Sequence, residues 1–176
     1  ITGDEYFGWQ NFGFYVIEQM LGYELITMNW EFSTRTDLIS YLGIPGDSSV
    51  VTILEPLGTN VQGMVGAGNA ALLSPEGLWL GSLTHVNPTS GYWVKVEESS
   101  QLCLSDAFAL DASTTTYNLH FGANLISFPN EGSIVIADAI PDDVEGAFTG
   151  VIGEGVAASP NPVLGWVGSL SAFEGG

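Results

Sequence analysis

The sequence predicts a mainly β protein of two tandem, sandwich-like antiparallel modules, each with about one short helix. Three observations support this expectation. Only 12% of the 176 residues are charged while 23 are glycine, a composition typical of short strands joined by tight turns. A long segment recurs along the chain. The apolar runs are short and end at glycine or proline.

The repeat is clearest between residues 63–83 and 150–170, where ten of 21 positions agree without a gap at an offset of 87. The same offset aligns LISY (38–41) with LISF (125–128). A period of this length suits a small domain that occurs twice. We therefore expect a first β module over 1–87 and a second over 88–176.

Several segments of one copy have recognisable secondary-structure signals. NLISF (124–128) reads as a strand ended by Pro129. GSIVIADAI (132–140) predicts a short helix with Ser133 as its N-cap. DSSVVTILEP (47–56) predicts the matching helix, capped by Asp47 or Ser48 and stopped by Pro56.

The later segments favour strands. GYWVKVEE (91–98) and SSQLCLSDAFAL (99–110) alternate in hydrophobicity and predict a hairpin. Residues 14–28 fit either a helix or a strand, and the aligned second copy favours the strand.

Glycine and tryptophan recur together in the repeat, and we interpret them as its structural core. The strands around 61–65 and 148–152 carry glycine on one face, which lets a bulky ring approach closely. A tryptophan buries roughly 200 Å². We therefore expect each repeated tryptophan to lie over a glycine strip. The residues of this core are Trp79, Trp166, Gly63, Gly150, Gly66 and Gly153.

The charge of the chain is lopsided, with 20 acidic residues against Arg35 and Lys95 and a net charge of −18. Such a charge repels phosphate backbones and anionic membrane surfaces, so we expect no nucleic-acid partner. No apolar run reaches the length of a membrane span, so we expect no membrane insertion. Strong self-repulsion is a mild indication of a saline or calcium-containing exterior, with a simply soluble acidic protein as the open alternative.

Four segments in their order and spacing resemble a repeat module of large secreted or surface proteins of environmental and marine bacteria and of structural proteins of their phages. They are GYWVKV (91–96), NLISFP (124–129), VIGEGVAA (151–158) and GWVGSL (165–170). The resemblance implies an extracellular setting, at a cell surface or in a virion, and a structural or adhesive role. It transfers no catalytic residues. The first copy departs from the pattern, with LISYLG for LISFPN and GAG for GEG.

The sequence offers two weak catalytic candidates. GDSS (46–49) resembles a hydrolase nucleophile block, but a serine needs a histidine base, and neither His85 nor His120 lies in a partner motif. Cys103 and His120 could form a nucleophile and base, yet the alternating LCLS run favours a buried, inert thiol. As the only cysteine, Cys103 cannot form an intramolecular disulfide. We expect no enzyme.

Two binding sites are conceivable. Four carboxylates gather in DAIPDDVEG and could hold Ca²⁺, although a charge run of this kind is more often a solvated acidic loop; they are Asp138, Asp142, Asp143 and Glu145. No other cofactor is expected. Trp93, with its neighbour Tyr92, is the best candidate for a ring that stacks on a sugar, although aromatic residues more often bury than bind.

These expectations converge on a structural subunit or repeat segment of an extracellular assembly, such as a phage fibre, a virion protein or a cell-surface filament. Its partners would be copies of itself or adjacent repeats. An open strand edge near FEGG (173–176) could pair with another chain. The alternative is a carbohydrate-binding or adhesion module that uses exposed aromatic residues.

Overall fold

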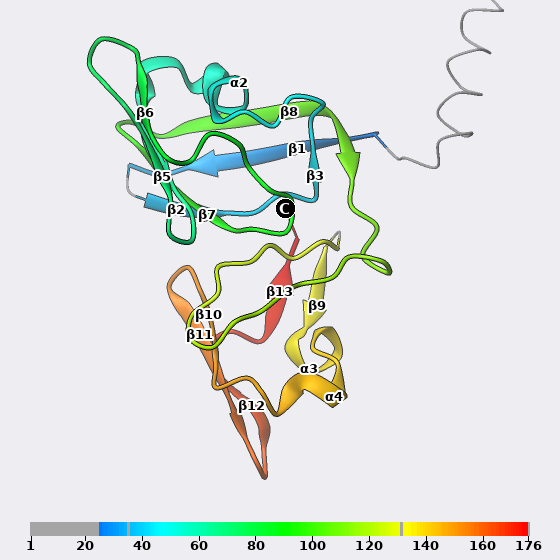
Figure 1. Cartoon of the computed structure of the whole chain (residues 1–176). Coiled ribbons are helices and arrows are strands. Elements are labelled where there is room, and N and C mark those ends of the chain that lie inside the picture. Colours follow the sequence, from blue (N-terminus) through cyan, green and yellow to red (C-terminus); the bar gives the residue numbers. More distant parts are fainter. Residues whose placement is uncertain (1–24, 35, 131, 176) are drawn as a thin grey trace, which may run out of the picture.

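A computed structural model of the chain describes residues 25–34, 36–130 and 132–175. The ribbon has two lobes (Figure 1): a first lobe, residues 25–109, contains β1 to β8, and a second lobe, residues 133–174, contains β9 to β13. The C-terminal end returns to the place where the lobes meet.

Short strands dominate both lobes. In the first lobe they are β1 Leu25–Phe32, β2 Thr36–Ile39, β3 Gly43–Ile44, β4 Val61–Val65, β5 Ala70–Leu73, β6 Trp79–Gly81, β7 Tyr92–Val96 and β8 Ser100–Ala109. In the second lobe they are β9 Ser133–Val135, β10 Val151–Gly153, β11 Val156–Asn161, β12 Gly165–Gly168 and β13 Ala172–Glu174. The helices are α2 Val50–Leu54, the 3₁₀ helix η1 Glu55–Asn60, α3 Ile136–Ala139 and α4 Asp142–Glu145.

All strand pairings are antiparallel. The first lobe has a three-stranded sheet in the order β1-β8-β3 and a five-stranded sheet in the order β2-β7-β4-β5-β6. The second lobe has a three-stranded sheet, β10-β11-β12, and a two-stranded sheet, β13-β9. The protein is thus mainly β with several antiparallel sheets, as the sequence predicts.

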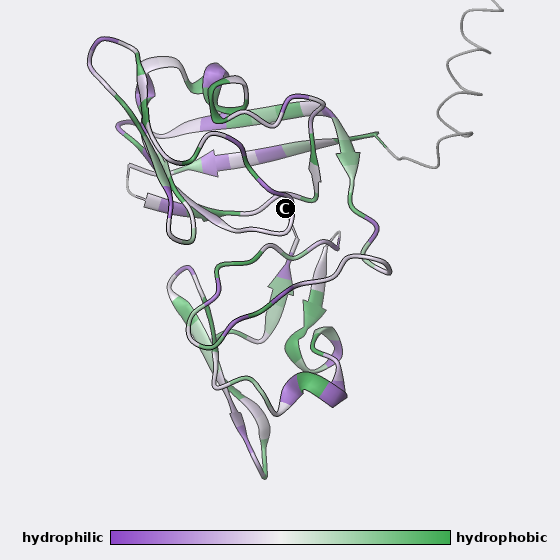
Figure 2. Cartoon of the chain, viewed as in Figure 1, coloured by the Kyte–Doolittle hydropathy of each residue, from purple (hydrophilic) through white to green (hydrophobic). Residues whose placement is uncertain are grey.

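Hydrophobic residues occur along the strands of both lobes (Figure 2). The buried hydrophobic clusters of the two lobes differ in size. Twenty buried residues, from Met28 to Ala107, form the cluster of the first lobe. The cluster of the second lobe has three buried residues among those described: Ile136, Ile140 and Ala158. The clusters divide the chain between Ala107 and Ile136, later than the 87/88 boundary that the repeat suggests, because β7 and β8 complete the first lobe.

The prediction that residues 91–110 form a hairpin is wrong. β7 lies between β2 and β4, whereas β8 lies between β1 and β3 in the other sheet. Both segments are strands with alternating burial, but each pairs with strands distant in sequence. Alternation identifies a strand and says nothing of its partner.

The helix ends also differ from their prediction. Ser49, not Asp47 or Ser48, caps α2, and its Oγ accepts from the Thr52 N–H at 3.3 Å. Pro56 does not stop the chain's helical turns, because it lies at the start of η1, where its missing N–H costs nothing. Ser133 begins β9 rather than a helix, since β13 supplies a strand partner for this β-branched run.

NLISF forms one isolated bridge, Ser90 with Ile126, instead of a regular strand. Its first-copy equivalent ends β2, where Leu38 and Ile39 pair with β7. Of the ambiguous segment 14–28, residues 25–28 belong to β1, and the remainder lies outside the described residues.

Candidate functional site

Both lobes contain the same three-stranded meander in the same register. In the first lobe, Met64 pairs with Ala71 and Ala71 pairs with Gly81. At the offset of 87, Val151 pairs with Ala158 and Ala158 pairs with Gly168. We define β4-β5-β6 as the first meander and β10-β11-β12 as the second meander.

Two equivalent glycines end the meanders for the same steric reason. Gly81 has φ +135° and Gly168 has φ +151°, a region that other residues rarely adopt. A Cβ on Gly81 would lie 2.1 Å from the Ala70 carbonyl oxygen, and one on Gly168 would lie 2.1 Å from that of Ala157. This close approach of neighbouring backbones explains why glycine recurs here.

The two meanders differ at the first strand. β4 has a neighbour on each side, β5 and β7, whereas β10 pairs with β11 alone among the described strands. We call the unpaired side of β10 the β10 edge.

Residues of β4, which has two neighbouring strands, are less exposed than the equivalent residues of β10. Met64 is 0% exposed on β4, which pairs with β7, while its equivalent Val151 is half-buried. Gly63 is buried, and Gly150 is exposed. Ile152 is 81% exposed, against 44% for its equivalent Val65. The β10 edge is thus a strand edge whose counterpart in the same molecule is covered.

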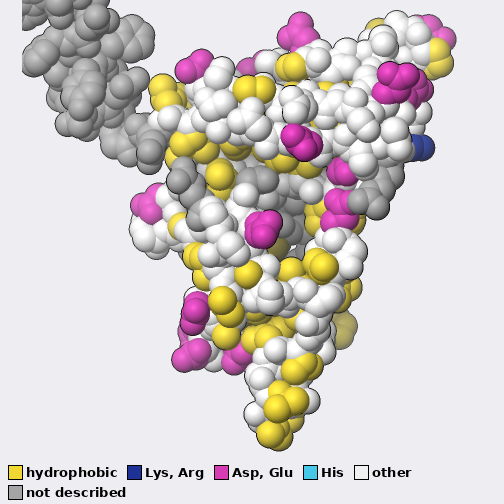
Figure 3. Space-filling view, turned by 180° about the vertical axis from the view of Figure 1, so that it is seen from behind, with side chains coloured by type: hydrophobic (Ala, Val, Ile, Leu, Met, Phe, Trp, Pro, Cys, Tyr) yellow, Lys and Arg dark blue, Asp and Glu magenta, His cyan; other side chains and the backbone are white. Residues whose placement is uncertain are grey.

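Apolar side chains also gather at the tapered end of the second lobe (Figure 3). Val163 and Leu164, in the turn between β11 and β12, are largely exposed, and Val167 follows on β12. Unpaired strand edges with apolar side chains are sites where other strands add.

A cleft of about 180 Å³ lies between 117–126 and the segment 89–90. Tyr117, His120 and Asn124 line it. Burial raises the pKa of Tyr117 above its ordinary value, and a bond of 3.2 Å between its hydroxyl and Ser127 Oγ offsets part of that shift. The cleft is smaller than the roughly 300 Å³ typical of small-molecule sites.

The prediction that each repeated tryptophan lies over a glycine strip is wrong. Trp79 pairs with Leu73 of β5, and Trp166 with Pro160 of β11, so a middle strand separates each tryptophan from the glycine-bearing strand. The nearest atoms to a Cβ on Gly63 belong to Ala71 and Leu72.

The other core glycines also lie against non-tryptophan neighbours. A Cβ on Gly66 would meet Asn69 and the Tyr92 ring, and one on Gly150 would meet the Ala158 carbonyl oxygen alone within 4 Å. One on Gly153 would meet Val156 and Leu170. Glycine here permits close strand packing, while each tryptophan packs on the cluster of its own lobe.

The four acidic candidates for calcium lie on or beside α3 and α4. Asp138, Asp142 and Asp143 are exposed, and Glu145 Oε1 accepts a hydrogen bond from Trp166 Nε1 at 2.6 Å. Within the described ranges, no three His, Cys, Asp or Glu side chains are grouped as metal ligands would be. Calcium binding stays a prediction.

The two aromatic candidates for sugar stacking occupy opposite faces of β7. Tyr92 is buried, its hydroxyl accepts from the Asn87 N–H at 2.7 Å, and it packs edge-on to Tyr41. Tyr92 therefore offers no open ring. Trp93 is half-buried on the other face, between Leu38 and Val65.

In the structure, a histidine lies next to the GDSS segment, because His85 forms an isolated antiparallel β-bridge with Ser49. The sequence alone did not place His85 there. The geometry is that of a helix cap. Asp47 accepts from the Ser49 N–H and the Thr52 hydroxyl, each at 2.8 Å, and these bonds lower its pKa. His85 Nδ1 lies 3.1 Å from Thr84 Oγ1.

Cys103 is exposed on β8, in contrast to the buried thiol that its alternating run predicted. Its neighbours Leu102 and Leu104 occupy the inward face. His120 lies in the cleft loop, with its Nδ1 2.9 Å from the Phe121 carbonyl oxygen.

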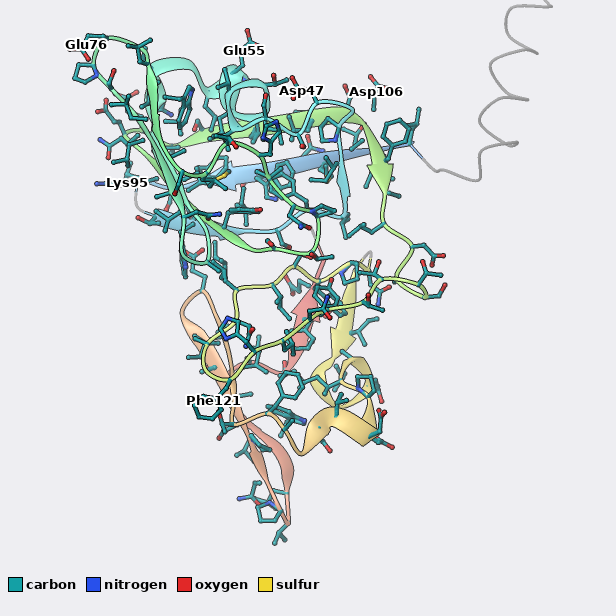
Figure 4. All side chains as sticks on the ribbon, in the orientation of Figure 1. Asp47, Glu55, Glu76, Lys95, Asp106 and Phe121 are labelled. Carbon is teal, nitrogen blue, oxygen red and sulfur yellow. The ribbon has the colours of Figure 1, made fainter. Side chains whose placement is uncertain are left out.

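Acidic side chains such as Asp47, Glu55, Glu76 and Asp106 project from the first lobe, and the fully exposed Phe121 projects from the segment that connects the two lobes (Figure 4). Among the described residues, no helix has the length and hydropathy to cross a membrane. No protein-family model, curated protein or solved structure matches the chain.

Proposed function

We propose that this protein is a self-associating structural subunit or repeat segment of an extracellular assembly, such as a phage fibre, a virion protein or a cell-surface filament. The proposed architecture is two tandem sandwich-like modules, one complete and one with an open strand edge. The role is non-enzymatic, and the partners are copies of the chain or adjacent repeats.

The observation that carries this proposal is the duplicated meander. Strand pairing is identical at an offset of 87, yet β4 is covered by β7 while the β10 edge is unpaired among the described residues. A repeated unit with one uncovered strand suits a chain that continues into further repeats or copies.

The net charge of −18 gives the association a predictable dependence on salt. Like-charged copies repel at low ionic strength, and the Debye length falls to about 10 Å at 0.1 M salt. Raising sodium chloride should therefore promote association. A saline exterior is a setting in which such a chain would assemble.

Light scattering and negative-stain electron microscopy test the proposal over a range of protein concentrations at low and high salt. We expect dimers, oligomers or filaments that increase with concentration and with salt. A chain that stays monomeric at every concentration and salt level would refute the structural role.

Carbohydrate binding is a second candidate, supported by the half-buried Trp93 and by the cleft that Tyr117 and His120 line. Isothermal titration with glycans from an array distinguishes the two locations. Trp93→Ala should abolish binding if the ring stacks on sugar, whereas His120→Ala should do so if the cleft holds it. An array without hits removes this candidate.

A further inference from the structure

We propose that residues 5–9 of a second copy add as an antiparallel strand to the β10 edge. This inference deepens the proposed function and rests on it, because it names the strand through which copies of the chain associate. Residues 5–9 lie outside the described residues, and the assignment comes from the repeat and from the pairing of β4 with β7.

The first lobe shows how the edge is filled. β7 pairs with β4 so that Met64 lies opposite Val94 and Val65 opposite Trp93. Residues 5–9 are the segment 87 positions before β7. Transferring the register to the second meander places Phe7 opposite Val151.

The same transfer places Tyr6 opposite Ile152, the most exposed residue of β10. It also places Gly8 opposite Gly150 and Trp9 opposite Phe148. The donor segment thus brings apolar side chains to a strand that contains the largely exposed Ile152.

At two of the three positions that correspond to inward residues of β7, the segment 5–9 has an aromatic residue. In β7 the inward residues are Tyr92, Val94 and Val96, all buried. Their equivalents Phe7 and Trp9 are large and apolar, and two aromatic side chains can extend a cluster that has three buried residues in the described part of the second lobe. Glu5 departs from the pattern, since it stands in the place of Tyr92.

The β12 edge provides an internal contrast. Among the described strands, β6 and β12 each pair with one neighbour, so this side of the meander is unpaired there in both lobes. The repeat therefore offers no occupant for the β12 edge. The β10 edge is the one whose equivalent is covered, and the chain itself contains a second segment at the repeat position of the covering strand.

A second copy is the donor that continues the repeat. In the first lobe, β7 leads into β8, which leads toward the second lobe. A copy whose residues 5–9 occupy the β10 edge would in the same way place its own first lobe next along the assembly. Such a head-to-tail contact builds a ring if its rotation closes and an open filament if it does not.

Disulfide trapping tests the assignment in the full chain. Cys103→Ser first removes the exposed native thiol. Chains with Tyr6→Cys and chains with Ile152→Cys are then mixed and oxidised, because directly opposed strand residues lie within disulfide reach. We expect the 6–152 disulfide between two chains, detected by peptide mass spectrometry.

The matched control replaces Ile152→Cys by Val167→Cys on the β12 edge. The 6–152 bond should form at least about tenfold faster than the 6–167 bond, since docking raises the effective thiol concentration. Adding Phe7→Asp to the Tyr6→Cys chain should remove this advantage, whereas Phe121→Asp should leave it unchanged. Equal rates for the two edges, or no effect of Phe7→Asp, would overturn the assignment.

Light scattering on the same Cys103→Ser chains separates the two possible failures. Association without the 6–152 preference overturns the strand assignment and leaves the structural role standing. Absence of association overturns the structural role as well.

Discussion

Both lobes contain the same meander, but more strands and more buried residues surround it in the first lobe than in the described second lobe. Nine of the twenty buried residues in the first cluster come from β1, β7 and β8, which have no regular counterparts in the described second lobe. Ile39 is buried beside β7, while its equivalent Ile126 is exposed. The comparison shows that the local sequence repeat is sufficient to specify the meander, whereas a full core needs the strands that flank it.

The largest expected contrast lies at the equivalent core positions Ile53 and Ile140. Ile53 is fully buried in the large cluster, so Ile53→Ala should destabilise the first lobe by about 2–5 kcal/mol. Ile140→Ala should cost about 2 kcal/mol or less, since fewer buried neighbours surround it. Urea denaturation followed by tryptophan fluorescence measures the loss of unfolding free energy in each variant. Equal losses in the two variants would contradict the claim that the first lobe has the more extensive core.

The next largest effect on stability is expected at the two equivalent glycines of the meanders. Gly81→Ala and Gly168→Ala should each cost more than about 1 kcal/mol, because both glycines have positive φ and no room for a Cβ. Gly46→Ala is the control, since nothing lies within 4 Å of its Cβ position. Thermal unfolding of the three variants checks this, and a neutral Gly168→Ala would break the equivalence of the meanders.

A smaller effect distinguishes the two repeated tryptophans. Trp166 donates to Glu145, whereas the residue equivalent to Glu145 in the first copy is Gly58. Glu145→Ala should cost about 1 kcal/mol and shift Trp166 emission, because the indole N–H loses its acceptor. Asp143→Ala, exposed on the same short helix, is the control. Unchanged fluorescence and stability in Glu145→Ala would show that the bond contributes nothing.

The smallest effect is a gain at Tyr41, whose equivalent in the second copy is Phe128. The Tyr41 hydroxyl is buried without a partner among the described residues. Tyr41→Phe should therefore be neutral or stabilising by about 1 kcal/mol. Its ring contacts with Trp30 and Tyr92 should persist, since phenylalanine keeps the aromatic ring.

Alkaline denaturation gives this variant a second readout. Burial raises the pKa of Tyr41 well above its ordinary value, while an unfolded tyrosine ionises near pH 10. The folded state thus holds the proton longer, and stability falls as pH rises past about 10. Tyr41→Phe should lose less stability over this range. An equal or greater loss would contradict the assigned burial of the hydroxyl.

Strand identity was predictable where alternation was strong, as in β7 and β8, and the repeat correctly aligned the meanders. Strand partners were not predictable, because the alternating pattern of β8 fits β1 as well as β7. Helix caps shifted by one or two residues, since Asp47 and Ser49 both offer side-chain acceptors at that turn. The tryptophan arrangement failed for a related reason: sequence periodicity does not show that a third strand intervenes.

Of the candidate site, the sequence already indicated an open edge but placed it near residues 173–176. In the structure, β13 (172–174) pairs with β9 alone, so one side of β13 is unpaired among the described strands, and a further unpaired edge, the β10 edge, lies in the second meander. Locating that edge required comparison of β4 with β10 in three dimensions. Their sequences alone do not show that only one of them has a covering neighbour.

Amide hydrogen exchange of β4 and β10 tests the central claim most directly. It compares the concentrated, high-salt wild-type chain with Phe7→Asp, using peptides that span 61–65 and 148–153. We predict slow exchange of 61–65 in both chains, and slow exchange of 148–153 in wild type that becomes fast in Phe7→Asp. Exchange of 148–153 that is the same in both chains would contradict the account.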